Sequence, residues 1–207
     1  MKKLLESRVE LIKNASIKEF VKDVLSSLSE DFWKIPCLGS GKYHPPENQG
    51  QEGLIRHLIK CVYIAEDLCR YFGLGDVDRD IVLAGTILHD IKKYGERKDR
   101  TDPRHGEIGA EFLDGFELEK NIKKKIKDCV KYHMYRFVGN KGNLERAKNP
   151  TKNEFIVQMA DFFSSRKYAS WLPGKEINEK EIKEFLKTGR TYQKALKTFF
   201  FFQKHAV

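Results

Sequence analysis

The sequence predicts an all-α fold, a bundle of helices that forms a single domain. Apolar residues recur three and four positions apart in almost every periodic segment, which is the period of an amphipathic helix. No segment alternates apolar and polar residues for long enough to predict a strand, and only the four phenylalanines at 199–202 fit a strand as well as a helix end. At 207 residues the chain is long enough for one sizeable domain and short for two.

Two helices are expected within residues 1–30, packed on the rest of the domain. Apolar residues at positions 4, 5, 9 and 12 predict a short first helix. Ser16 and Glu19 have the spacing of a capping box, so they predict the start of the second. After a segment rich in Pro and Gly, a long helix is expected over about 51–72, with Gly73 as its stop.

Four more helices complete a core that we expect to span 31–175. The first is expected from Asp76 or Asp78 to near Asp90, and the second from Asp102-Pro103 to Leu113. The third is expected from near Ile122 to near His133, and the fourth from Asn153 to Trp171. Residues 176–207 are expected to form a helical extension of the same domain, with one helix from Asn178 to near Gly189 and a last aromatic segment over 191–203.

Composition argues against a membrane protein and a secreted one. The longest uncharged apolar stretch, at 81–89, has nine residues, against about 20 for a spanning helix. The first 30 residues carry a charge every few positions and hold no apolar run typical of a secretory signal. The four cysteines lack C-x-x-C spacing, which favours a reduced protein, and we expect a cytoplasmic one.

The formal net charge is +9, and it is concentrated. Residues 121–152 contain ten Lys or Arg, opposed only by Asp128 and Glu145. Such a window is typical of a polyanionic partner, although a solvated helix face followed by a basic loop fits it as well. Aromatic residues interleave with Lys131 and Arg136, a mixture that stacks bases in a charged groove or packs in a core.

Histidines and aspartates occupy buried-looking positions on five successive helices. His89 and Asp90 follow an apolar run, and Asp161 lies between apolar residues. Burying such carboxylates costs free energy unless a cation compensates. A single His on an apolar face is usually a hydrogen-bonded core residue, but the ordered set suggests a shared divalent metal. The set is His57, His89, Asp90, His105, His133 and Asp161.

These motifs resemble the HD superfamily of metal-dependent phosphohydrolases, which is named for a His-Asp pair on a helical bundle. Gly-Leu-Ile-Arg-His at 53–57 is similar to the family's first helix, Ile-Leu-His-Asp-Ile-Lys-Lys at 87–93 to its signature, and Ala160-Asp161 to its closing aspartate. His105 and His133 match the extra histidines of members with a binuclear site. The resemblance spans roughly residues 44–166 and implies an HD-type bundle.

The resemblance implies one metal on His57, His89, Asp90 and Asp161, with Asp90 bridging to a second metal on His105 and His133. Mixed imidazole and carboxylate ligands suit one or two ions of Mn, Fe, Co, Ni or Zn better than Mg. Lys93 stands where many two-metal members place a lysine, so it is assigned to a substrate phosphate; the alternative is a solvated lysine beside Lys92. Asp90 and Lys93 are thus the expected catalytic residues, and Lys93, His44 and Arg136 the expected substrate contacts.

Two features of the sequence indicate which HD subfamilies it resembles less and more. The chain has no Gly-Tyr-Pro tripeptide and a short interval from His89 to His105, which argues against the cyclic-dinucleotide phosphodiesterases. Tyr43-His44-Pro-Pro followed by Gly-Leu-x-x-His is more similar to the HD domain of bacterial 3′→5′ exoribonucleases. Their nucleic-acid-binding barrel has no counterpart here, and His44 is either a substrate contact or plain surface.

The leading hypothesis is a hydrolase that uses a metal-activated water to cleave a phosphoester of a nucleotide or a single-stranded nucleic acid. A small-molecule nucleotide phosphatase is the second hypothesis, distinguished by a closed pocket rather than an open groove. The third is a non-catalytic helical module that binds nucleic acid or another partner. The sequence leaves the oligomeric state open.

Overall fold

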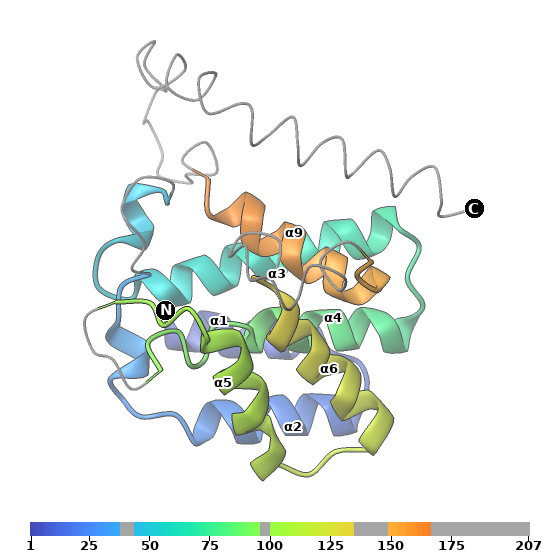
Figure 1. Cartoon of the computed structure of the whole chain (residues 1–207). Helices are drawn as coiled ribbons and strands as arrows, with labels where there is room; N and C mark the ends of the chain where they lie inside the picture. Colours follow the sequence, from blue (N-terminus) through green and yellow to red (C-terminus); the bar gives the residue numbers. More distant parts are fainter. Residues whose placement is uncertain (38–43, 96–99, 135–148, 167–207) are drawn as a thin grey trace. The chain divides into compact units, whose positions relative to one another are not determined.

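The computed structural model describes residues 1–37, 44–95, 100–134 and 149–166, and these are helical as predicted (Figure 1). No strand occurs within these ranges. All of them belong to a compact unit that comprises residues 1–170, and a second unit comprises 171–207. The helix predicted at 178–189 and the aromatic segment at 191–203 lie outside the described residues, so the extent of the domain stays a prediction.

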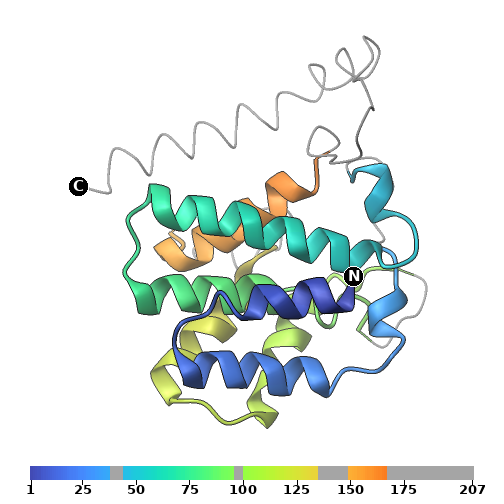
Figure 2. The same ribbon diagram turned by 180° about the vertical axis from the view of Figure 1, so that it is seen from behind.

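The two N-terminal helices are α1 (Lys2–Val9) and α2 (Ala15–Ser26). The capping box predicted at Ser16 is wrong: Asn14 is the N-cap, and its side chain accepts a hydrogen bond from the backbone N–H of Ile17. The turn between the helices is fixed by Asp80, whose Oδ2 accepts from the backbone N–H groups of Lys13 and Asn14. α1 contacts α3 and α4, and α2 contacts α4, on the side shown in Figure 2.

Three helices form the centre of the core: α3 (Gly53–Tyr71), α4 (Asp76–Leu88) and α9 (Lys152–Ser164). α3 packs on both others, as Figure 1 shows. Every residue of α4 from Asp80 onward is buried, and α9 is buried from Glu154 to Phe162. A helix that is apolar on all sides is typical of a buried position. Because α4 and α9 are both buried, the few polar residues that they carry lie in the interior.

The start of α9 differs from the prediction. Its N-cap is Thr151 and not Asn153, because Thr151 and Glu154 together form a capping box. The side chain of Asn153 instead donates a hydrogen bond to Asp78 of α4 at 3.0 Å. The helix end predicted at Trp171 lies outside the described residues.

α5 (His105–Phe112) and α6 (Lys120–Tyr132) pack on each other, and α6 also packs on α4. α5 begins three residues after Asp102, which was predicted to cap it, because the Asp102 side chain accepts from Arg104 N–H in a preceding turn. Gly106 permits the close approach of α5 to the end of α6: a Cβ there would lie 2.8 Å from the carbonyl oxygen of Lys131.

Short 3₁₀ helices complete the described part: η1 (Phe32–Lys34), η2 (Pro46–Asn48) and η3 (Leu113–Gly115). η1 and η2 both contact α3. Among the described residues, no helix combines the length and the apolar character that crossing a membrane requires.

Candidate metal centre

The six predicted metal ligands come together in the interior of the bundle. His57 lies in α3, and Asp161 in α9. His89 and Asp90 directly follow α4, His105 begins α5, and His133 directly follows α6. All six side chains are buried, and the most accessible, Asp161, is only 7% exposed. Residues from five segments, which span more than a hundred positions of sequence, therefore share one buried site.

One side of this site is formed by His57, His89, Asp90 and Asp161. Nε2 of His57 lies 3.1 Å from Oδ1 of Asp161 and 3.6 Å from Oδ2 of Asp90. Nε2 of His89 lies 3.5 Å from the same Asp90 oxygen and 3.8 Å from the same Asp161 oxygen. Two imidazole nitrogens thus alternate with two carboxylate oxygens around a common point.

The other side is formed by His105, His133 and the second oxygen of Asp90. Oδ1 of Asp90 lies 3.1 Å from Nε2 of His105 and 3.6 Å from Nε2 of His133. Asp90 therefore turns one oxygen to each half of the site. This is the arrangement expected of a carboxylate that bridges two ions, the role that the sequence resemblance implies for Asp90.

The hydrogen bonds of the four histidines set their tautomers. Nδ1 of His89, His105 and His133 lies within 2.7 Å of the backbone carbonyl oxygens of Thr86, Asp102 and Val130, and Nδ1 of His57 lies 2.7 Å from Oγ of Ser164. A carbonyl oxygen only accepts, so His89, His105 and His133 donate from Nδ1; the single hydroxyl proton of Ser164 goes to the carbonyl oxygen of Asp161, so His57 also donates from Nδ1. The four Nε2 atoms are then lone-pair donors aimed into the site, as metal-ligating imidazoles require.

Several polar atoms of the site lack a partner that protein groups could supply. Nε2 of His89 and Oδ1 of Asp90 are buried and have no hydrogen-bond partner among the described residues. Nε2 of His105 and His133 lie 2.9 Å apart although both carry lone pairs, which repel each other. Cations would satisfy all of these atoms. Atoms that share an ion at bond lengths of about 2.0–2.2 Å lie roughly 3 to 3.5 Å apart, so the residues fit divalent transition metals.

Lys93 is the one cationic side chain that reaches this site in the described part of the chain. It is 8% exposed, and its Nζ donates to Oδ2 of Asp90. Burial disfavours the ammonium, but the carboxylates of Asp90 and Asp161 and the neighbouring Cys37 together outweigh burial and raise the pKa of Lys93 above its ordinary value. Burial likewise opposes ionisation of Asp90, yet Lys93 and His89 hold the pKa of Asp90 well below its ordinary value. Both groups are therefore charged at neutral pH.

His44 lies at the edge of the site and is half-buried. Its ring meets that of His57 edge to face, with centroids 5.6 Å apart, and its Nδ1 lies 3.8 Å from Sγ of Cys37. Burial lowers the pKa of His44 to about 3, so the ring is neutral at pH 7. The structure thus places His44 beside a predicted ligand, whereas Arg136 lies outside the described residues.

Sequence reasoning missed residues that support the ligands. Ser164 contacts His57, and Cys61 Sγ lies 3.0 Å from Oγ of Ser164. All four cysteines are free and buried, but Cys61 also belongs to a polar cluster. The only available signals were Ser164 three residues after Asp161 and Cys61 four after His57, and such spacings are common in any helix.

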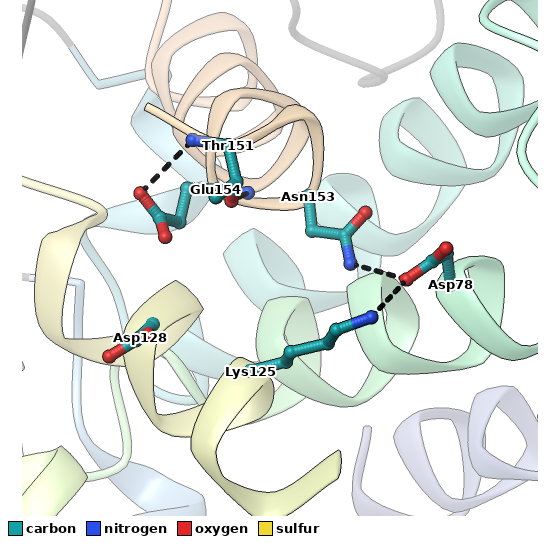
Figure 3. Close-up of a pocket in the computed structure, with 6 residues that line it drawn as sticks. All are labelled: Asp78, Lys125, Asp128, Thr151, Asn153 and Glu154. Carbon is teal, nitrogen blue, oxygen red and sulfur yellow. Dashed lines mark hydrogen bonds and ion pairs between the residues drawn. The ribbon is translucent and has the colours of Figure 1, made fainter. Parts of the chain in front are cut away.

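A separate cavity of about 230 Å³ lies between the starts of α4 and α9 and the middle of α6. In Figure 3, Lys125 and Asn153 both reach Asp78, and Glu154 turns back to Thr151. Asp78 and His89 lie near opposite ends of α4, which at 1.5 Å per residue separates them by roughly 16 Å. This cavity is therefore not the opening of the histidine–aspartate site.

The basic window is partly neutralised where the structure describes it. Lys124 pairs with Asp128 at 2.6 Å, Lys125 with Asp78 at 3.2 Å, and Lys127 with Asp114. These pairs offset much of the charge on α6. Four of the ten basic residues of the window, at 136, 141, 146 and 148, lie outside the described residues, so a polyanionic partner stays a prediction.

Acidification is expected to destabilise the metal-free protein. Burial lowers the pKa of His133 to about 4, that of His44 to about 3, and that of His57 below its ordinary value, whereas Asp90 outweighs burial and raises the pKa of His89. The unfolded chain binds more protons at the first three histidines below about pH 6.5, so their contribution to stability is present above that pH and is lost as pH falls.

His89 acts in the opposite direction, because a raised pKa contributes stability below about pH 6.5. Three histidines lose their stabilising contribution as pH falls, and only His89 gains one. We therefore expect the melting temperature of chelator-treated protein to fall by about 5 °C or more between pH 7.5 and pH 5. Thermal unfolding followed by circular dichroism measures it. An unchanged or higher melting temperature at pH 5 would contradict the neutral state of His133, His44 and His57.

Comparison with known proteins adds one finding. A family model described as "HD domain" matches residues 54–165, more than half of the chain. The match includes all six clustered residues, from His57 in α3 to Asp161 in α9. Neither the curated proteins nor the solved structures contain a match to this chain.

Proposed function

The chain belongs to the HD domain family, and from this premise we propose that it hydrolyses a phosphoester of a nucleotide or of a single-stranded nucleic acid. Members of this family are in general metal-dependent phosphohydrolases, and such proteins bind divalent metals. The observation that carries the proposal is the placement of Asp90, whose two oxygens face two separate sets of imidazole nitrogens. A site of this form suits two ions, which is a common device for phosphoryl chemistry.

The ligands proposed for one ion are His57, His89 and Asp161, those for the other are His105 and His133, and Asp90 serves both. When bound, the ions supply positive charge against the phosphoryl oxygens and lower the pKa of water toward neutrality. The protein itself contributes ligands that are held in fixed positions and a site that is closed to bulk water. Backbone carbonyls and Ser164 hold the imidazole rings in place, and burial of the site excludes bulk water.

Lys93 is proposed to bind a phosphate oxygen of the substrate. It is charged, and an ammonium has three donors, so Nζ can keep its hydrogen bond to Asp90 and donate another to substrate. His44 is proposed to contact substrate as a neutral ring beside His57, and Arg136 is proposed to do so as a cation. His44 is half-buried, and Lys93 and Asp161 are 8% and 7% exposed against 0–1% for the other five ligands, which supports an approach of substrate from their side.

A small-molecule nucleotide phosphatase is the second candidate, and two observations favour it. All six clustered residues are at least nine-tenths buried, whereas a nucleic-acid strand needs an open groove. The ion pairs of Lys124, Lys125 and Lys127 also weaken the basic surface of α6. A short substrate with one terminal phosphate fits these features better than a long strand does.

The experiment compares three substrates on protein loaded with Mn²⁺, Co²⁺ or Zn²⁺: bis(p-nitrophenyl) phosphate, nucleoside 5′-monophosphates and a labelled single-stranded oligonucleotide. Turnover of a diester or the oligonucleotide supports the leading proposal, and release of inorganic phosphate from monophosphates alone supports the second. Metal-loaded protein that turns over none of the three contradicts both, and leaves the non-catalytic module.

Replacing Lys93 by Met is expected to lower kcat/KM by about 100-fold, the usual effect of removing one donor to a reacting phosphoryl or acyl oxygen. The matched control is Lys92→Met, because Lys92 is the adjacent lysine and its Nζ lies over the ring of Phe112 rather than in the site. Steady-state kinetics measure both variants. Equal kcat/KM values for the two would remove Lys93 from its proposed role.

A further inference from the structure

His57 is held differently from the other three clustered histidines. Each of the others bonds through Nδ1 to the backbone carbonyl oxygen three residues before it in its own segment. Nδ1 of His57 bonds to a side chain of another helix, Oγ of Ser164, at 2.7 Å. Ser164 is the last residue of α9, 107 positions further along the chain.

The position of His57 within its helix explains this exception. His89 and His133 directly follow the last turns of α4 and α6, and His105 begins α5 after a turn. At the carboxyl-terminal ends of α4 and α6 the last carbonyl oxygens have no helical N–H to accept, and at α5 the carbonyl of Asp102 lies before the helix, where it accepts both the backbone N–H and the Nδ1–H of His105. His57 is the fifth residue of the 19-residue α3, where every nearby carbonyl already accepts a helical hydrogen bond. Its ring needs an acceptor from outside α3.

The hydroxyl of Ser164 is fully committed to this contact. A hydroxyl has one proton to donate and two lone pairs that accept. Oγ of Ser164 donates to the backbone carbonyl oxygen of Asp161 at 3.3 Å and accepts from Nδ1 of His57. Its second lone pair faces Sγ of Cys61 at 3.0 Å, so Cys61 is the S–H donor. The same serine thereby ties α3 to the turn of α9 that carries Asp161.

Sγ of Cys61 lies within 4.8 Å of ligand atoms of His57, His89 and Asp161, so its direction from the ring of His57 decides whether it is a ligand. Its Sγ lies 3.6 Å from Nε2 and 3.9 Å from Nδ1 of His57. Nearly equal distances to both nitrogens put the sulfur beside the ring, whereas an ion bound by Nε2 lies beyond that atom. The thiol therefore supports Ser164 and leaves the space in front of Nε2 open.

We propose that Ser164 is a positioning residue for the metal centre, which fixes the tautomer and the direction of His57 so that Nε2 faces the carboxylates of Asp161 and Asp90. The affinity of the ion on the His57 side then depends on the Ser164 hydroxyl. The ion on the His105 and His133 side does not, because backbone carbonyls hold those two rings. The inference concerns metal binding and does not depend on which substrate the protein hydrolyses.

The test is Co²⁺ binding to metal-stripped full-length protein, followed by visible absorption in the presence of a competing chelator. Ser164→Ala is expected to weaken one of two Co²⁺ dissociation constants by about 10- to 100-fold, the usual cost of losing a partner of a metal-bound imidazole. The other constant is expected to stay as in the unaltered protein. Ser164→Thr restores the hydroxyl, and is expected to restore most of the affinity.

Ser27→Ala is the matched control. Ser27 directly follows α2, much as Ser164 ends α9, and its Oγ also bonds back to a carbonyl three residues earlier, at 2.7 Å from Val24 O. It bonds to no histidine within the described residues. It is expected to bind both ions normally. Unchanged Co²⁺ affinity in Ser164→Ala, or equal loss in the Ala and Thr variants, would overturn the proposal, even if the metal-free protein melts at a lower temperature.

A measurement on the unaltered protein covers the case in which Ser164→Ala does not fold. Nitrogen NMR of the Zn²⁺-loaded protein is expected to show His57 protonated at Nδ1. A His57 ring protonated at Nε2 would refute the inference without any variant. Protein that binds two ions but hydrolyses no phosphoester would remove the function proposed above and leave the role of Ser164 intact.

Discussion

Asp90→Asn is expected to lower metal-dependent hydrolysis by at least about 1000-fold, equivalent to about 4 kcal/mol of activation free energy. The change preserves the shape of the side chain and removes its charge. It also replaces one of two oxygens with an NH₂ group, which cannot bind a cation. Because the oxygens of Asp90 face different halves of the site, one half loses its carboxylate ligand. Metal analysis and steady-state kinetics measure the two consequences together.

The control for Asp90→Asn must separate chemistry from folding. Removal of one partner of a buried ion pair costs about 3–5 kcal/mol, and Asp90→Asn leaves the Lys93 ammonium without its carboxylate. Asp80→Asn is the matched variant, because Asp80 is equally buried but binds Arg79 and the turn before α2, remote from the histidines. It is expected to lose stability and to keep its activity per folded molecule. An Asp90→Asn protein that folds, binds two ions and retains a tenth of the activity would refute the bridging role.

Gly53→Ala is expected to destabilise the protein by about 3 kcal/mol or more, at the upper end of overpacking costs. A Cβ at position 53 would lie 2.0 Å from the carbonyl oxygen of Asn48 and 3.0 Å from the backbone nitrogen of Cys37. These two groups form a hydrogen bond of 2.8 Å with each other, so neither can move aside alone. Chemical denaturation with a fluorescence readout measures the loss of unfolding free energy. In thermal unfolding, we expect a melting temperature lower by roughly 6 °C or more.

The Gly53 substitution should also impair the metal centre, because Gly53 lies one helical turn before His57 and packs against Asn48, four residues after His44. Gly115→Ala is its matched control: a Cβ there meets no atom within 4 Å, and the backbone at Gly115 does not have a positive φ. We expect its stability within about 0.5 kcal/mol of that of the unaltered protein. Equal stability of both variants would contradict the close packing of η2 on α3.

Local sequence was a good guide to where helices lie and a poorer guide to where they begin. The 3.6-residue periodicity predicted α3 over 51–72 and the structure has Gly53–Tyr71, because burial of an apolar stripe outweighs local detail. Asn14 rather than Ser16, and Thr151 rather than Asn153, cap their helices. Both pairs offer acceptable capping residues within two positions, and tertiary contacts such as Asn153 with Asp78 decide between them.

The order and chemical types of the histidines and aspartates are properties of the sequence alone, and they sufficed to predict a helical bundle with a buried cluster and the HD family. Only the tertiary structure decided how the cluster is arranged: that the two oxygens of Asp90 face opposite halves, and that His57 needs Ser164 from another helix. The same holds for the ion pairs that neutralise Lys125 and Lys127. The physical reason is that helix periodicity fixes which side chains share a face, whereas hydrogen bonds and ion pairs between helices depend on distances of a few ångströms that only packing sets.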